Sequence, residues 1–296
     1  MTLSSSSNEA ADGDGSSRPR LGVVAGGGAL PRLVCEAERN AGGDPFVIAL
    51  RANAGDWVSD YENTVSGPGQ VGRIFAALSG ARCGRVCFAG ALQRPSLSNV
   101  RFDFTALRVL PVMRRLMRQG DDGLLRGLAQ IFEARGFTMV GAHELLGELL
   151  APMGPLGART PNQSDLTDIE RAAEIVAALG AVDVGQGAVV ARGRCLAVET
   201  VQGTDVMLGR LEGDTRRGGA PIPSGVLYKS PKPGQDLRLD LPAIGPETIR
   251  RAATAGLNGV AVRSGGVFIL DVDETIAAAD AAGVFLFGWD PEEGPG

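Results

Sequence analysis

Apolar runs alternate with amphipathic stretches through the N-terminal third of the chain. The runs are continuous, which is typical of strands buried on both faces of a parallel sheet. They occupy 21–25, 45–51 and 84–90, with helical patterns at 29–42 and 69–78. Strand, helix and strand in this order predict right-handed crossovers, so the first half is expected to be a doubly wound, Rossmann-like α/β domain.

The periodicity is lost around 150–168, where proline, glycine and polar residues gather. Beyond it, a helix is predicted at 168–179, then two strands that meet at Gly193 in a hairpin. Pro246 is placed to begin a further helix, and three more strands have the sequences GVAVR, GVFIL and VFLFG. The second half is therefore expected to be mixed α/β. The predicted division is a disordered tail (1–20), a Rossmann-like domain (21–151), a linker (152–164) and a mixed α/β domain (165–296).

Residues 228–246, YKSPKPGQDLRLDLPAIGP, crowd charge onto a sequence unsuited to a helix. Its Pro-Gly pair predicts a turn. The alternation that follows predicts a strand with Asp236, Arg238 and Asp240 on one face. Carboxylates beside cations suit magnesium and a diphosphate, because magnesium takes hard oxygen ligands, usually one or two carboxylates plus substrate phosphates. A solvated turn is the alternative interpretation.

Three weaker motifs accompany this segment. Glycines at 26–28 stand between a strand and a helix N-terminus, where backbone amides favour a phosphate; close packing is the alternative. Asp121 and Asp122 start a helix, either as acids that complement its dipole or as carboxylates near a metal-bound pyrophosphate. Glu199, Thr204 and Asp205 follow a strand, and Glu199 at the strand end is expected to face either a cleft or solvent.

The composition argues against several classes of function. The net charge of -5 argues against a general nucleic-acid binder. The single histidine, His143, leaves almost no room for zinc hydrolases or Ser-His-Asp hydrolases, and we interpret it as a structural or capping residue. The four cysteines form no CxxC pair and are predicted to be small buried thiols in a reducing cytoplasm.

No apolar run approaches the ~20 residues that span a bilayer, so any membrane contact is expected to be peripheral. One amphipathic stretch, from about 104 to 118, carries a basic side. It predicts a core-facing helix with a solvated cationic face, or a helix that lies on an anionic membrane surface. Its flanking arginines are Arg108, Arg114, Arg115 and Arg118.

Several long motifs, in order, resemble the LpxI-type UDP-2,3-diacylglucosamine pyrophosphatases of lipid A biosynthesis. They are LGVVAGGGALP, FAGALQRPSLSNVRFDF, QGDDGLLR, DVGQGAVV, CLAVETVQGTDVML and KPGQDLRLDLPAIGPETI. The resemblance implies a magnesium-dependent hydrolase that cleaves this lipid-linked nucleotide sugar to UMP and 2,3-diacylglucosamine 1-phosphate. It also implies two domains around a shared cleft, a cytoplasmic location with peripheral contact at the inner membrane, and a homodimer.

The hypothesis for the site follows from charge and from this resemblance. The predicted catalytic residues are Asp236, Asp240, Lys232 and Arg238. The predicted ligands of Mg²⁺ are Asp236, Asp240 and Asp122. The predicted substrate-binding residues are Gly26, Gly27, Gly28, Lys229, Gln235, Thr204 and Glu199.

Two other classes of protein compete with this interpretation. A NAD(P)-dependent oxidoreductase would explain the glycine loop, but the end of the second strand offers Arg51 and Asn53 where an acid is expected, and the first acid is Asp56. A noncatalytic protein that binds a nucleotide sugar or a phospholipid would keep the glycines and the cations. Such a binding protein would have no use for magnesium.

Overall fold

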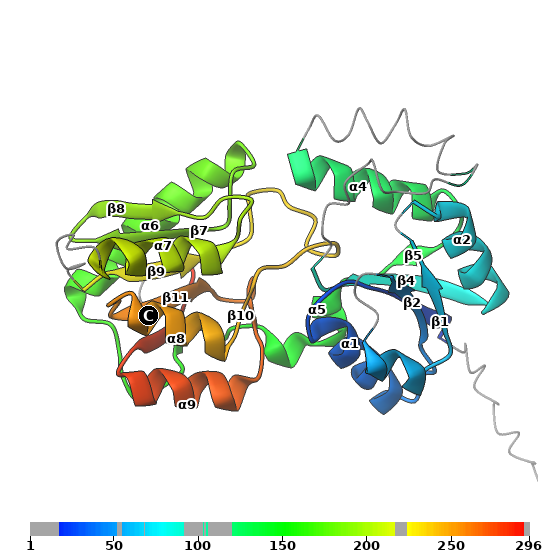
Figure 1. Ribbon diagram of the computed structural model, residues 1–296, viewed down its shortest axis with the longest axis horizontal. Helices are drawn as coiled ribbons and strands as arrows, with labels where there is room; N and C mark the ends of the chain where they lie inside the picture. The colour runs from blue at the N-terminus through cyan, green and yellow to red at the C-terminus, as the bar shows by residue number, and fades with distance from the viewer. Residues whose placement is uncertain are drawn as a thin grey trace, which may run out of the picture.

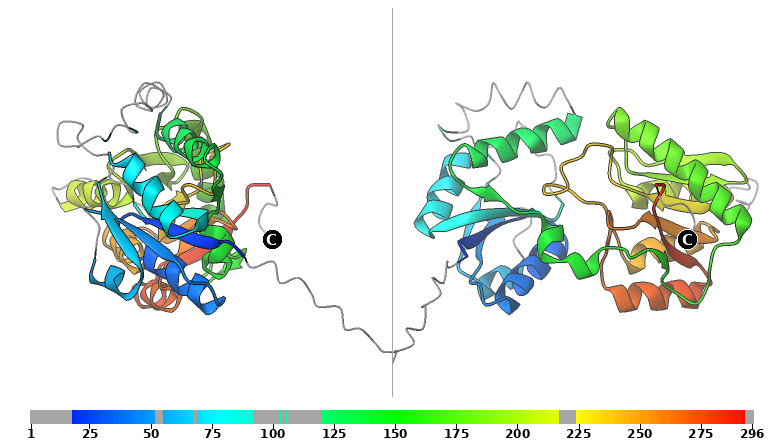
Figure 2. Two further views of the ribbon diagram at one scale, coloured as in Figure 1. Left: turned by 90° about the vertical axis from the view of Figure 1, so that its right-hand side faces the viewer. Right: turned by 180° about the vertical axis from the view of Figure 1, so that it is seen from behind.

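The computed structural model describes residues 18–51, 55–67, 69–91, 103, 105, 120–216 and 224–292. Two large sheets organise this part of the chain, one in each half, and helices lie on both faces of each sheet (Figure 1). The view from behind shows the same two halves (Figure 2). The predicted fold class, a Rossmann-like domain followed by a mixed α/β domain, is confirmed.

The first sheet has five parallel strands in the order β3-β2-β1-β4-β5. They are β1 (Arg20–Ala25), β2 (Phe46–Leu50), β3 (Asn63–Ser66), β4 (Cys83–Ala89) and β5 (Thr138–Met139). Leu21 and Val23 of β1 belong to one apolar cluster and Val24 to another, so its side chains alternate between two buried faces. This double burial explains the continuous apolar runs of the sequence. The edge strand β3 was not predicted, because its sequence, NTVS, is mostly polar.

Helices cover both faces of the first sheet. On one face lie α1 (Leu30–Asn40) and α5 (Ala142–Leu145), and on the other lie α2 (Val71–Gly80) and α4 (Gly120–Glu133). Short 3₁₀ turns are η1 (Asp56–Asp60) and η3 (Gly147–Leu149). In α4, the buried Phe132 ring packs edge-on to Phe88 of β4, with ring centroids 5.2 Å apart. This aromatic contact fixes the last turn of α4 against the sheet.

The second sheet is mixed, in the order β6-β13-β11-β9-β7-β8. Its strands are β6 (Gly154–Pro155), β7 (Gly187–Ala191), β8 (Arg194–Val198), β9 (Val226–Lys229), β11 (Gly259–Arg263) and β13 (Phe285–Trp289). The strands β9, β11 and β13 are parallel to one another, and the other three pair antiparallel. The predicted hairpin at Gly193 is confirmed as β7 and β8. Because β6 pairs with β13, part of the segment 152–164 belongs to this sheet.

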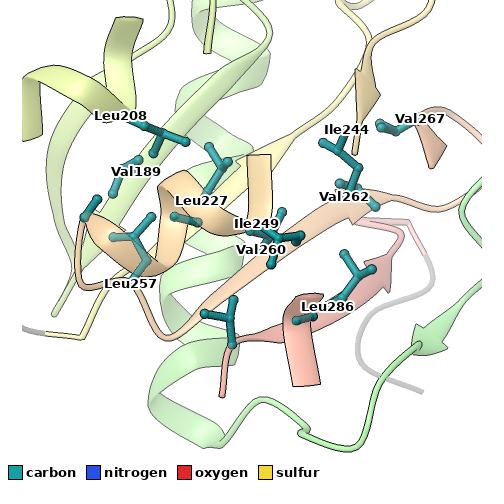
Figure 3. Packing of buried hydrophobic residues seen from close by; sticks show 14 of the residues in the cluster. Val189, Leu208, Leu227, Ile244, Ile249, Leu257, Val260, Val262, Val267 and Leu286 are labelled. Carbon is teal, nitrogen blue, oxygen red and sulfur yellow. The ribbon is translucent and has the colours of Figure 1, made fainter. Parts of the chain in front are cut away.

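The helices of the second half again lie on two faces. On one face lies α6 (Gln163–Ala181), and on the other lie α7 (Thr204–Arg216), α8 (Pro246–Thr254) and α9 (Val272–Ala282). Figure 3 shows the second of these interfaces, where Ile249 of α8 and Leu208 of α7 meet Leu227, Val260 and Leu286 of the sheet. A small parallel pair, β10 (Ala243–Ile244) and β12 (Phe268–Ile269), completes this half.

The predicted start of helix α6 at Asp168 is wrong. The helix begins five residues earlier, at Gln163. The true N-cap is Asn162, whose Oδ1 accepts hydrogen bonds from the amides of Ser164 (2.8 Å) and Asp165 (3.1 Å). Asp168 is instead 2% exposed, and its carboxylate accepts from two amides of the β7–β8 turn, including that of Gly193 at 2.7 Å. A buried acid in the helix therefore fixes the hairpin.

The predicted strand through Asp236, Arg238 and Asp240 is also wrong, because this stretch folds as turns. The Asp236 carboxylate accepts from the Arg238 amide at 3.1 Å, and its carbonyl accepts from the Leu239 amide at 3.0 Å. An aspartate that bonds the backbone two residues on favours a turn over a strand. Asp236 and Arg238 meet within this turn, whereas Asp240 contacts Gln235.

We call residues 230–242, between β9 and β10, the bridging segment. In Figures 1 and 2 it extends from the second half toward the first. Leu239 is 7% exposed and belongs to the apolar cluster that includes Phe132 of α4, while Leu241 packs against the cluster on the opposite face of the same sheet. Phe268 of β12 joins that second cluster. Apolar anchors from the second half thus pack into the core of the first.

The cysteines correct one expectation. Cys35, Cys83 and Cys87 are buried as predicted, and burial raises the pKa of the Cys35 thiol to about 12 and that of Cys83 to about 11. Cys195 is exposed, contrary to the prediction, because β8 is an edge strand of the second sheet. Apolar residues beside a cysteine in the sequence therefore do not ensure its burial when its strand lies at the edge of a sheet.

Two predictions lie outside the described residues. They concern the N-terminal tail, of which 1–17 is not described, and the arginine-rich stretch, of which 106–119 is not described. Among the residues that are described, no helix combines the length and the apolar character needed to cross a lipid bilayer.

Leu239→Ala is expected to lower the free energy of unfolding by about 2–5 kcal/mol, the cost of a cavity in a packed core. Leu237, two residues earlier and 36% exposed, offers a matched control. Leu237→Ala is expected to change stability by roughly 0.5 kcal/mol or less. Urea unfolding of both variants measures the difference. Equal stabilities would contradict the anchoring of the bridging segment in the first half.

Candidate active site

Arg238 lies between two carboxylates that come from different halves of the chain. Its Nε and Nη2 donate to the two oxygens of Asp236 at 3.0 and 2.7 Å. Its Nη1 donates to Oε1 of Glu133, the last residue of α4, also at 3.0 Å. The hydrogen bonds from Arg238 lower the pKa of Asp236, so this carboxylate stays ionised at pH values where an ordinary aspartate begins to protonate.

The first half approaches this turn closely at Gly141. A side chain at Gly141, the N-cap of α5, would place its Cβ 3.0 Å from the Arg238 Cα. The same Cβ would meet the ring of His143 at 2.4 Å. The cap of α5 is completed by Glu144, whose carboxylate accepts from the Gly141 amide at 2.7 Å, so the capping role considered for His143 belongs to its neighbour. Within the described structure, the buried Nδ1 of His143 has no hydrogen-bond partner.

Asp240 is held by two amide side chains. Gln235 Nε2 donates to its Oδ2 at 2.9 Å, and Gln186 Nε2 lies 3.3 Å from the same oxygen. Gln186 also lies 3.3 Å from Gln235 Oε1, which in turn accepts from the backbone amide of Lys232 at 2.9 Å. Two predicted residues, Gln235 and Asp240, are therefore brought together, and Gln186 was missed.

Lys232 forms an ion pair with Asp183, just beyond the end of α6. Asp183 has a positive φ of 58°, in the left-handed region where helices usually end on glycine. Gly180, three residues earlier, lets α6 approach the bridging segment, because a Cβ there would lie 2.7 Å from Pro233 Cδ. Asp183 and Gln186 both belong to DVGQGAVV, a motif of the family resemblance, so the sequence did hold a signal for them.

Lys229, Thr204 and Glu199, all predicted to bind substrate, form a second cluster. The Lys229 ammonium is buried at the end of β9 and donates to Thr204 Oγ1 at 2.7 Å, at the start of α7. Glu199 Oε2 lies 3.7 Å from the same nitrogen and, among the described contacts, is a buried oxygen without a hydrogen bond. The cluster therefore consists of a buried lysine and a nearby glutamate whose buried Oε2 makes an ion pair at 3.7 Å but no described hydrogen bond.

Two amides of the glycine loop form hydrogen bonds to the backbone at the end of β4. The amides of Gly26 and Gly27 donate to the carbonyls of Ala89 (2.8 Å) and Ala91 (2.9 Å), so the ends of β1 and β4 are joined at the reversal of strand order. A Cβ at Gly26 would lie 2.7 Å from the Ala91 carbonyl oxygen. This explains one glycine by close packing. A phosphate contact from the loop stays a prediction, and so does the cleft between the halves.

The predicted magnesium site depends on which carboxylates lie close together. Among the described residues, no group of three or more His, Cys, Asp or Glu side chains is close enough to hold a metal ion. The side chain of Asp122, the third predicted ligand, lies outside the described residues. Asp236 and Asp240, both in the bridging segment, offer hard carboxylate oxygens of the kind that magnesium takes beside substrate phosphates, although both oxygens of Asp236 accept hydrogen bonds from Arg238.

Both halves of the chain match domains of one protein family. Residues 20–149 match the LpxI N-terminal domain, and residues 152–287 match the LpxI C-terminal domain. The chain is also 44% identical, over 278 residues, to the UDP-2,3-diacylglucosamine pyrophosphatase LpxI of Caulobacter vibrioides (strain ATCC 19089 / CIP 103742 / CB 15). That alignment covers 93% of this chain and 99% of the relative. The chain belongs to the LpxI family, as the motifs of the sequence indicated.

Lys229→Met is expected to destabilise the fold by roughly 3 kcal/mol, because it leaves Glu199 buried without its cation. The double variant Lys229→Met/Glu199→Gln removes both charges and is expected to recover most of that loss. Urea unfolding of the two variants and of Glu199→Gln completes the cycle. If Lys229→Met is as stable as the wild type, the two charges do not interact in solution.

Proposed function

We propose that this protein hydrolyses the diphosphate of UDP-2,3-diacylglucosamine and releases UMP and 2,3-diacylglucosamine 1-phosphate. The observation that carries this proposal is the 44% identity to a pyrophosphatase of that name across 93% of the chain. The matched C-terminal domain, 152–287, contains the whole bridging segment. Its charged residues are the kind that a diphosphate requires.

During the reaction, negative charge on the phosphoryl oxygens must be stabilised by nearby cations. The oxygen of water forms a bond to one phosphorus while the bond from that phosphorus to the bridging oxygen breaks. The bridging oxygen leaves with the second phosphate, and the proton of the water passes to solvent or to a base. Cations held in advance near the phosphoryl oxygens lower the barrier, because their orientation need not change during the step.

Arg238 and Lys232 are the cations that we propose for this role, with Lys229 as a third that binds substrate. Arg238 offers a planar guanidinium that matches a phosphate edge, and lysine acts as a point charge. Each already has an acidic partner: Asp236 and Glu133 for Arg238, Asp183 for Lys232 and Glu199 for Lys229. These carboxylates hold the cations in place before the substrate arrives.

Magnesium is the cofactor that we propose, with Asp236 and Asp240 as the residues that would hold it and Asp122 as a further candidate. When bound, the ion would neutralise phosphate charge and lower the pKa of a water molecule. Gln235 and Gln186 fix the orientation of the Asp240 carboxylate through hydrogen bonds to its Oδ2. Asp236 contributes an ionised carboxylate, which Arg238 keeps charged and oriented.

The same proposal places the protein in the cytoplasm at the inner membrane surface, because a substrate with two acyl chains partitions into lipid. The arginine-rich stretch of the sequence is the candidate for this contact, since basic residues are attracted to anionic lipid. A homodimer is likewise an expectation from the family.

The test is mass spectrometry of the products after incubation with UDP-2,3-diacylglucosamine and magnesium in oxygen-18 water. We expect UMP and 2,3-diacylglucosamine 1-phosphate from the wild type. Asp236→Ala is expected to lose at least about 100-fold in rate, as when a preorganised charged group is removed from an active site. The product that carries the heavy oxygen identifies the phosphorus attacked.

The control for the Asp236 variant is its thermal unfolding, which should match that of the wild type. A folded wild-type protein that binds the substrate without cleaving it would favour the noncatalytic binding protein. Near-normal turnover by Asp236→Ala would remove Asp236 from the mechanism.

The pH dependence of kcat/KM provides an independent test of the Asp236–Arg238 contact. Arg238 lowers the pKa of Asp236, so Arg238→Gln raises that pKa and is expected to move the acidic limb of the profile to higher pH. Arg126 lowers the same pKa by charge alone and is the smallest of the named causes. Arg126→Gln should therefore shift the limb less. An acidic limb that stays in place in Arg238→Gln would show that Asp236 does not set it.

A further inference from the structure

Glu133 occupies a position that the rules of helix stability disfavour. It is the last residue of α4, whose last turn contains no basic side chain. The carbonyl end of a helix carries a partial negative charge, so an acid there is unfavourable. Arg135, just beyond the helix, stacks 4.0 Å over the ring of Phe75 and donates to the Ile131 carbonyl. A residue that violates a local rule is a candidate for a functional role.

The cation that compensates Glu133 comes from the other half of the chain. Arg238 is 105 residues away in sequence, and its Nη1 donates to Glu133 Oε1 at 3.0 Å. The remaining edge of the guanidinium, Nε and Nη2, is occupied by Asp236. Because the guanidinium is planar, fixing Nη1 at Glu133 also fixes the edge that faces Asp236.

Both ends of this ion pair are attached to the same core. Phe132, directly before Glu133, is 2% exposed, and Leu239, directly after Arg238, is 7% exposed in the same cluster. Pairs between half-exposed side chains usually contribute little, since the freedom of two long side chains must be lost. Here the backbones on both sides are already held by buried neighbours, so less freedom remains to be lost.

We infer that Glu133 is a positioning residue of the active site, which orients Arg238 and, through it, Asp236. This inference rests on the proposed function, because it assigns the residue to the hydrolysis of the diphosphate. It also places part of the site's support in the first half, although the charged motif lies in the second. The chemical role of Glu133 is to hold the guanidinium; it does not touch the reacting atoms.

A double-mutant cycle tests the inference. Glu133→Ala is expected to lower kcat for UDP-2,3-diacylglucosamine by about tenfold with a smaller change in KM, since a misoriented catalytic group costs rate. Glu133→Gln keeps an acceptor oxygen at the same distance and should retain part of the lost rate. In the Arg238→Ala background, Glu133→Ala should have no further effect. Additive losses would overturn the inference.

A second readout does not depend on turnover. In protein labelled with nitrogen-15 arginine, the Nε–H signal of Arg238 is assigned by its absence in Arg238→Lys. Glu133→Ala is expected to broaden or shift this signal, because the guanidinium is then held by Asp236 alone. Glu174 pairs with Arg171 at 2.6 Å on an exposed part of α6, and Glu174→Ala should leave both the signal and kcat unchanged.

The two readouts separate the inference from the proposed function. If the wild type does not cleave the substrate, the proposed function fails, and the Arg238 signal decides by itself whether Glu133 fixes the guanidinium. If the wild type cleaves the substrate but Glu133→Ala changes neither the signal nor kcat, Glu133 is not a positioning residue. Thermal unfolding of each variant verifies that the fold is retained.

Discussion

The burial of Leu239 in the core of the first half is the contact on which the proposed site depends. It holds the bridging segment away from the sheet that it leaves at β9 and keeps it against α4 and α5. Proline and glycine make this segment unable to form a helix. Leu239 anchors it in the core of the first half. The charged residues on either side of Leu239 are consequently held at a junction of the two halves.

Charge compensation is the second constraint. Every cation of the bridging segment that we assign to substrate has a carboxylate beside it, as Arg238 has Asp236 and Lys232 has Asp183. Each carboxylate offsets the charge of the cation beside it and holds that cation in place. The protein thereby keeps concentrated positive charge in a fixed arrangement without a large net charge of its own.

Local pattern predicted most of the helices and strands, and it failed where a side chain competed with the backbone. The strand expected through Asp236 is a turn because its carboxylate bonds the amide two residues later. The start of α6 was missed because Asn162 caps it before the apolar periodicity begins. The glycine loop was predicted correctly in place, but two of its amides are used by the neighbouring strand end.

The sequence by itself determined the α/β class and the family, because periodicity and ordered motifs are properties of the chain alone. It also identified Lys229, Thr204 and Glu199, which the fold brings together. Only the tertiary structure decided that Arg238 pairs with Glu133, because the two are 105 residues apart and no local pattern relates them. Their contact exists because Phe132 and Leu239, their immediate neighbours, are buried in one core.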